Sequence, residues 1–320
     1  MFWSVLMACG PQLSATPEPI EFESLPTPPP SLAGLTPADG ELHLVDQGRT
    51  AGVNAGLALS SDGLWAHAGM KGYTCDVWTH DGSVAADLDY PGNGDEVIDG
   101  TDDRLLVRTE DGLFVTRFNQ HTASGQLVEE FLADARLVDG GLATLAYDGE
   151  ACRVAWYTQV EAPDQTLAVD DSWCGGGVMM LAERDTGTVW LLDEGRLMHV
   201  TPQGEHVIAL GGDQLAWDPV HRQAWVGRTG DAGIAAVDPD GGWTMHETAG
   251  PVSALSSLGQ VGAVVVGSAD TLEILWGADG SLWGTYEGLL APDTVLSADS
   301  GAVVGVQDGT TARFFLGEVF

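Results

Sequence analysis

The chain from residue 41 onward consists of short apolar runs that are separated by turn signals. The segment Asp213–Trp243 illustrates the pattern, because "LAWDP", "QAWVG" and "GIAAVDPDG" are rich in aliphatic and aromatic residues and end in Gly, Pro or Asp. Runs of this length and punctuation are typical of antiparallel β-strands joined by tight turns. Helical periodicity is nearly absent, so the pattern predicts an all-β fold.

The pattern repeats along the chain with a nearly constant period. The first apolar run of each unit begins, in order, at Leu57, Val97, Leu137, Val178, Leu215, Val252 and Val295. Neighbouring starts are 37 to 43 residues apart. A period of about 40 residues with several strands per unit is typical of propeller blades. We therefore expect a seven-bladed β-propeller of four-stranded antiparallel blades.

The two ends of the repeat region predict how the ring closes. The seventh unit supplies three strands, and Glu41–Gln47 ("ELHLVDQ") alternates apolar and polar residues ahead of the first unit. Ring closure removes open sheet edges, so we expect this N-terminal strand to complete the last blade. The expected domains are a signal remnant at 1–9, a Pro-rich flexible tether at 10–40 and the propeller at 41–320.

Within Asp213–Trp243, "LAWDPVHRQAWVG" and "IAAVDPDG" resemble the repeated strands of the NHL/YVTN/WD40-like group of β-propellers. The resemblance implies the fold. It assigns no catalytic residues, because this fold carries many unrelated functions.

The N-terminal residues carry a second resemblance. Leu6-Met7-Ala8-Cys9 resembles the lipobox of bacterial lipoproteins, which implies that Cys9 is acylated after export and cleavage. Residues 10–40 contain eight prolines, and such segments are extended and semi-rigid. In that family, Gly10 after the cysteine implies the outer membrane or cell surface. We expect a membrane contact through the lipid anchor alone.

The net charge of the chain limits the classes of partner that can bind it. It has 12 basic and 47 acidic residues, a net charge of −35, and a single lysine, Lys71. A nucleic-acid backbone would be repelled, so no nucleic-acid partner is expected. The charge favours solubility or an acidic face that recruits cations or a basic partner.

Acidic residues supply the candidate sites. A possible partner-binding face consists of polar residues in the loops that enter the first strands, namely Asn54, Asp95, Asp134, Asp171, Asp213 and Asp293. These loops would converge around the central channel and bind Ca²⁺ or a basic loop, or they are ordinary turn residues. The densest acidic run supplies weak metal candidates, namely Asp95, Asp99, Asp102 and Asp103. Calcium is the one cofactor that these residues suggest. Because the run lacks the residue order of a calcium-binding loop, no cofactor is expected.

The four cysteines have no metal-ligand spacing. Cys152 opens the third strand of one unit, and Cys174 precedes the first strand of the next unit. Either they form a disulfide between adjacent blades in an oxidising compartment, or both are buried thiols.

No convergent catalytic set is present in the sequence. We therefore expect a non-catalytic scaffold displayed on the cell envelope, with a protein or glycan partner. The alternatives are a structural subunit of an envelope assembly and a metal-dependent hydrolase of the lactonase type. The hydrolase would require Asp95, Asp134, Asp213 and Asp293 to converge on one ion.

Overall fold

The structure is a computed structural model of the whole chain. It describes residues 36–42, 44–51, 55–59, 65–68, 74–78, 84–89, 94–101, 104–109, 112–117, 125–127, 131–158, 162–259, 261–268, 271–287, 294–297, 302–307 and 310–316.

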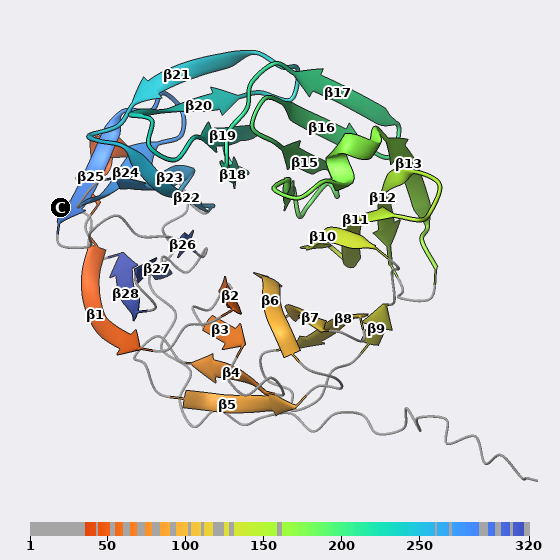
Figure 1. The fold of residues 1–320 in the computed structure, drawn as a ribbon. Coiled ribbons are helices and arrows are strands. Elements are labelled where there is room, and N and C mark those ends of the chain that lie inside the picture. The colour runs from red at the N-terminus through yellow and green to blue at the C-terminus, as the bar shows by residue number, and fades with distance from the viewer. Residues whose placement is uncertain are drawn as a thin grey trace, which may run out of the picture.

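The described strands form four-stranded antiparallel sheets arranged in a ring (Figure 1). One sheet contains β2 (Ala55–Leu59), β3 (Trp65–Ala68), β4 (Thr74–Trp78) and β5 (Val84–Asp89). The next contains β6 (Gly94–Thr101), β7 (Arg104–Thr109), β8 (Gly112–Arg117) and β9 (Gly125–Leu127). It is followed by β10 (Leu132–Val138), β11 (Gly141–Tyr147), β12 (Cys152–Tyr157) and β13 (Gln165–Val169).

Three further sheets follow along the chain. The first has β14 (Met179–Ala182), β15 (Val189–Leu192), β16 (Leu197–Thr201) and β17 (Gly204–Ile208). The second has β18 (Gln214–Asp218), β19 (Gln223–Gly227), β20 (Gly233–Val237) and β21 (Trp243–Glu247). The third has β22 (Val252–Leu258), β23 (Ala263–Ser268), β24 (Thr271–Trp276) and β25 (Leu282–Glu287).

The remaining sheet joins the two ends of the described chain. It contains β26 (Thr294–Ser297), β27 (Ala302–Gln307), β28 (Thr310–Leu316) and β1 (Leu44–Ala51). β1 pairs with β28 from Leu44 opposite Leu316 to Ala51 opposite Thr310, and the two lie side by side in Figure 1. The strand therefore runs three to four residues later than the expected Glu41–Gln47.

The residues ahead of β1 attach to a different sheet. Leu42 is fully buried, and its backbone N–H donates to the carbonyl of Trp283 in β25 at 3.1 Å. The indole Nε1 of Trp283 donates to the carbonyl of Gly40 at 2.7 Å. A 3₁₀ turn, η1 (Pro37–Asp39), precedes this contact. The segment before β1 is therefore held against the sheet next to the one that β1 completes.

The hydrophobic core lies between neighbouring sheets. One cluster combines Trp190 of β15 with Trp217 of β18 and Val226 of β19. The next joins Trp225 of β19 to Val264 of β23. The middle strands are apolar on both faces because a neighbouring sheet covers each face, whereas the outermost strands β17 and β21 are mostly exposed. This layered packing explains why "GIAAV" is continuously apolar.

The blade count expected from the repeat needs correction. Described side chains pack into cores in five blades of four antiparallel strands, from β6 to β25. The other two four-stranded sheets, β2–β5 and β1 with β26–β28, are defined by backbone pairing. The repeat of apolar runs predicts where strands lie along the chain. A packed blade also requires buried side chains on its two faces. Seven repeats therefore do not establish seven packed blades. The all-β class is confirmed.

Helical structure is minor in the described part of the chain. Besides η1, it contains η2 (Asp171–Cys174), a single 3₁₀ turn between β13 and β14. Within these described residues, no helix is long and apolar enough to span a membrane.

Candidate functional site

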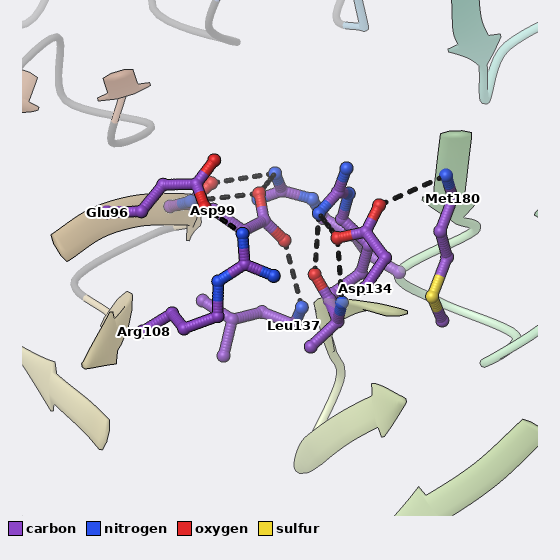
Figure 2. A network of polar contacts seen from close by, with 10 residues as sticks. Glu96, Asp99, Arg108, Asp134, Leu137 and Met180 are labelled. Carbon is purple, nitrogen blue, oxygen red and sulfur yellow. Dashed lines mark hydrogen bonds and ion pairs between the residues drawn. The ribbon is translucent and has the colours of Figure 1, made fainter. Parts of the chain in front are cut away.

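Two aspartates on the inner strands link one blade to the next. β6 has an irregularity between Val97 and Asp99, and β10 has one between Leu132 and Asp134. The Oδ1 atom of Asp99 accepts a hydrogen bond from the backbone N–H of Gly100 (2.8 Å). Its Oδ2 atom accepts from the backbone N–H of Leu137 in the next blade (2.8 Å; Figure 2). A bulge re-aims a side chain, and here it turns the carboxylate toward the neighbouring inner strand.

Asp134 repeats this arrangement one blade later. Its Oδ1 atom accepts from the backbone N–H of Ala135 (2.8 Å), and its Oδ2 atom accepts from the backbone N–H of Met180 in β14 (3.2 Å; Figure 2). Arg136 also donates to Oδ1 at 2.6 Å. Burial raises the pKa of Asp134, and Arg136 and the backbone donors oppose that rise. Both aspartates therefore tie neighbouring blades together.

Arginines balance the acidic groups around this point. Arg108 pairs with Glu96, its cross-strand neighbour, and Arg184 lies 3.3 Å from Asp99. Together with the Arg136–Asp134 pair, these contacts place positive groups beside the carboxylates, and Figure 2 shows Arg108 beside Glu96. A small cavity of about 180 Å³ lies here, lined by Glu96, Ile98, Arg108, Ala133, Asp134 and Arg136. Because its acids are paired with arginines and backbone amides, the cavity has little unbalanced charge.

The other members of the expected partner-binding face also serve the backbone where they are described. Asp171 accepts from the backbone N–H of Cys152 at 3.0 Å, and Asp213 accepts from that of Thr229 at 2.7 Å. The following expected residues lie outside the described residues or have side chains that do: Cys9, Asn54, Asp95, Asp102, Asp103 and Asp293. Among the described side chains, no cluster of three or more His, Cys, Asp or Glu residues has a metal-holding geometry. The acidic run therefore stays a weak calcium candidate, and the expectation of no cofactor stays a prediction.

The cysteine pairing that the sequence left open is present in the structure. Cys152 of β12 forms a disulfide with Cys174 of η2, and their Cα atoms are 5.7 Å apart. The adjacent Trp173 is buried, with the guanidinium carbon of Arg196 lying 4.5 Å from its ring centroid. The disulfide thus fastens the connection between two neighbouring blades.

A buried carboxylate that the sequence did not single out lies between β14 and β15. The side chain of Glu183 accepts from Trp190 Nε1 and from Thr186 Oγ1, each at 2.9 Å. His199 Nε2 lies 3.5 Å from the same carboxylate, and its ring stacks 4.3 Å from Trp190. Burial alone would raise the pKa of Glu183, but the hydrogen bonds from His199, Trp190 and Thr186 lower it overall. These contacts indicate that Glu183 stabilises the core. It belongs to no sequence motif that would have pointed to this role.

A larger groove lies at the outer end of the junction between the β18–β21 and β22–β25 blades. It measures about 580 Å³ and is lined by Gln223, Ala236, Asp238, Gly242, Trp243, Thr244, His246, Gly277, Ala278 and Asp279. The side chain of Gln223 donates to the carbonyl of Gly277 and so bridges the two blades. Trp243 and Met245, on the outer strand β21, are 50% and 54% exposed. This combination of apolar and acidic groups was not apparent from the sequence.

The two carboxylates of the groove are held by turns. Asp238 accepts from the backbone N–H of Gly242 at 3.0 Å, and Asp279 accepts from that of Ser281 at 2.9 Å. Hydrogen bonds from Ser281 lower the pKa of Asp279. Burial lowers the pKa of His246, with Asp279 opposing that change. At neutral pH these shifts favour an anionic Asp279 and an uncharged His246.

Comparison with known proteins relates the chain to others by fold. No protein-family model and no curated protein sequence matches it. A solved structure of BBS1N in complex with ARL6DN matches with a TM-score of 0.64 and 12% identity, covering 86% of this chain and 97% of that one. BamB from Moraxella catarrhalis matches with a TM-score of 0.54 and 16% identity, covering 88% and 92%.

A chain of the Mitotic Checkpoint Complex matches with a TM-score of 0.60 and 13% identity, covering 92% of this chain and 99% of that one. These structures support the β-propeller fold. At such low identity the likeness extends to the fold alone.

Proposed function

We propose that this chain is a non-catalytic protein-binding scaffold, displayed on the bacterial cell envelope by a lipid on Cys9. The observation that carries the binding role is the outer strand β21, where Trp243 and Met245 are half exposed and Trp243 also lines a groove. Tryptophan and methionine are enriched at protein interfaces, and exposed apolar patches mark interaction sites. This composition favours a protein partner over a glycan.

The chemistry of the inner face supports a non-catalytic role. Asp134 and Asp213, two members of the set that a metal-dependent hydrolase would need, accept hydrogen bonds from backbone amides. Asp99 does the same across a blade boundary. The described carboxylates on the inner face therefore stabilise the backbone of the propeller.

Three features support display on the envelope. The residues before Cys9 resemble a lipobox, and a Pro-rich segment follows it. The disulfide between Cys152 and Cys174 fits an oxidising compartment such as the periplasm or cell surface.

Two of the similar solved structures are of protein complexes, which agrees with a binding role for propellers of this shape.

Site-specific photo-crosslinking of the full chain in a Gram-negative host tests the binding role. A benzophenone amino acid at Met245 is expected to give a discrete adduct with one protein. Phe131 is the control position because it is 62% exposed and lies beside a different blade. Failure to form an adduct at Met245, or the same adducts from both positions, would refute the proposed surface.

Intact mass and membrane fractionation test the anchor separately. We expect a triacylated product that begins at Cys9 and sediments with the outer membrane. A soluble product that retains Met1 would refute the lipid anchor without affecting the binding role.

A structural subunit of an envelope assembly is the second candidate. Val207 of β17 and Leu282 of β25 are also exposed, so apolar side chains occur on the outer strands of three successive blades. A permanent subunit would co-purify with its partners through high-salt washing, whereas a scaffold with exchanging partners would be recovered alone.

A further inference from the structure

The strand β21 has an outer edge that no other strand covers within its sheet. It is the last strand in the order β18-β19-β20-β21, and Figure 1 places it on the rim of the ring. Its pairing with β20 runs from Trp243 opposite Val237 to Glu247 opposite Gly233 with no register shift. Natural edge strands are protected by Pro, Lys, bulges or a covering element. The sequence "WTMHE" contains no Pro or Lys, and its one charged residue, Glu247, stands at the end of the strand.

The groove beside this edge is acidic. Asp238 and Asp279 lie in turns of two neighbouring blades, and both line it. No Lys or Arg is among its described lining residues. His246 stays uncharged at neutral pH because burial lowers its pKa. Exposed Glu247 ends the strand, so the surroundings of the groove are acidic as well.

We infer that β21 and this groove bind an extended segment of a partner protein that carries arginine or lysine side chains. The inference rests on the proposed scaffold function and specifies the chemistry of its partner. The segment adds to the edge of β21 through backbone hydrogen bonds, a known mode of peptide recognition. A cationic side chain enters between Asp238 and Asp279, where opposite charge sets specificity.

Fluorescence anisotropy with defined peptides tests this inference on the full chain. The probe is a fluorescein-labelled peptide of eight residues that alternates arginine and valine, measured at physiological ionic strength. Its counterpart has glutamate in place of each arginine. We expect saturable binding of the arginine peptide and none of the glutamate peptide.

Paired variants separate the groove from the net charge of the protein. Asp238→Asn with Asp279→Asn keeps an oxygen acceptor for each turn amide but removes both charges. Asp139→Asn with Glu150→Gln removes two exposed charges from another blade and is the matched control. Because each partly exposed ion pair contributes modestly to binding, the groove variant should bind roughly tenfold more weakly. The control should bind like the unaltered chain, and equal losses in both would overturn the inference.

Two N-methylated versions of the arginine peptide test the strand addition. Methylation of alternate backbone nitrogens removes donors on one edge of the peptide, and the two possible methylation phases are compared. We expect one phase to abolish binding and the other to preserve it. Equal binding of both would overturn the strand mode. An adduct at Met245 in cells without any dependence on Asp238 and Asp279 would preserve the scaffold function and overturn the partner chemistry.

Discussion

Replacement of Glu183 probes the buried hydrogen-bond network of the propeller core. The side chain is 1% exposed and accepts hydrogen bonds from Trp190 and Thr186, with His199 and Arg222 each 3.5 Å away. Glu183→Ala leaves the fully buried indole N–H of Trp190 without its acceptor. An unsatisfied buried donor costs about 1–3 kcal/mol, and breaking a buried charged contact raises the total to roughly 3–5 kcal/mol.

This cost converts into a measurable change in melting temperature. With an unfolding entropy of about 2.1 cal/mol/K per residue, a chain of 320 residues shifts by about 1.5 °C per kcal/mol. Glu183→Ala should therefore lower the melting temperature by about 4 to 8 °C. Glu183→Gln retains one acceptor oxygen and should cost roughly half as much. Calorimetry and urea unfolding at neutral pH measure both variants.

The neighbouring Asp185 supplies a matched control. It lies in the same turn and is 59% exposed, with its carboxylate 3.8 Å from Arg222. Asp185→Ala should change the free energy of unfolding by less than about 0.5 kcal/mol, because surface pairs contribute little. Equal effects of the alanine variants at Glu183 and Asp185, or a cost below about 1 kcal/mol for Glu183→Ala, would refute the assignment.

The pH dependence provides a second check on Glu183. Its hydrogen bonds lower its folded pKa below the unfolded value, so the folded state favours the carboxylate form. The stabilisation is complete above the unfolded pKa of about 4.3 and is lost as the pH falls through the folded pKa. The difference between the unaltered chain and Glu183→Gln should therefore shrink on acidification. A constant difference from pH 7 to pH 3 would contradict this account.

Three further predictions follow from other contacts. Reduction of the disulfide between Cys152 and Cys174, or replacement of both by serine, should lower the free energy of unfolding by about 3 kcal/mol in urea unfolding. The reason is that the bridge joins residues 22 positions apart. Unchanged stability would contradict its structural role. Asp99→Ala should accelerate hydrogen exchange at the amide of Leu137 and cost about 1–3 kcal/mol, with unchanged exchange as the contrary result. Gly280→Ala should cost about 1–2 kcal/mol or more in thermal unfolding, since its φ is +70° and a Cβ atom would lie 2.1 Å from an imidazole nitrogen of the preceding blade; a neutral effect would contradict this packing.

The architecture was largely readable because it depends on local patterns. Alternating apolar runs and turn residues predicted where strands begin, and the repeat marker Leu215 falls within β18. Pattern alone did not establish how many units have packed side-chain cores, since packing between sheets is a tertiary property. It also misplaced the closing strand, because the buried side chain of Leu42 holds the preceding residues against β25.

The candidate site was less predictable because its contacts join residues far apart in the chain. The sequence placed Asp134 on a possible partner-binding face, and only the structure shows that its carboxylate accepts a hydrogen bond from the backbone N–H of Met180, 46 residues away. The groove at β21 depends on Asp238 and Asp279 meeting across a blade boundary.

The sequence by itself determined the all-β class, the strand repeat, the strongly acidic charge and the candidate pair Cys152 and Cys174. The tertiary structure decided that this pair is bonded and which carboxylates link blades. It also decided which side chains stay exposed on β21. The physical reason is that strand formation responds to neighbouring residues, whereas hydrogen-bond partners, burial and pKa shifts depend on groups brought close only by the closed ring.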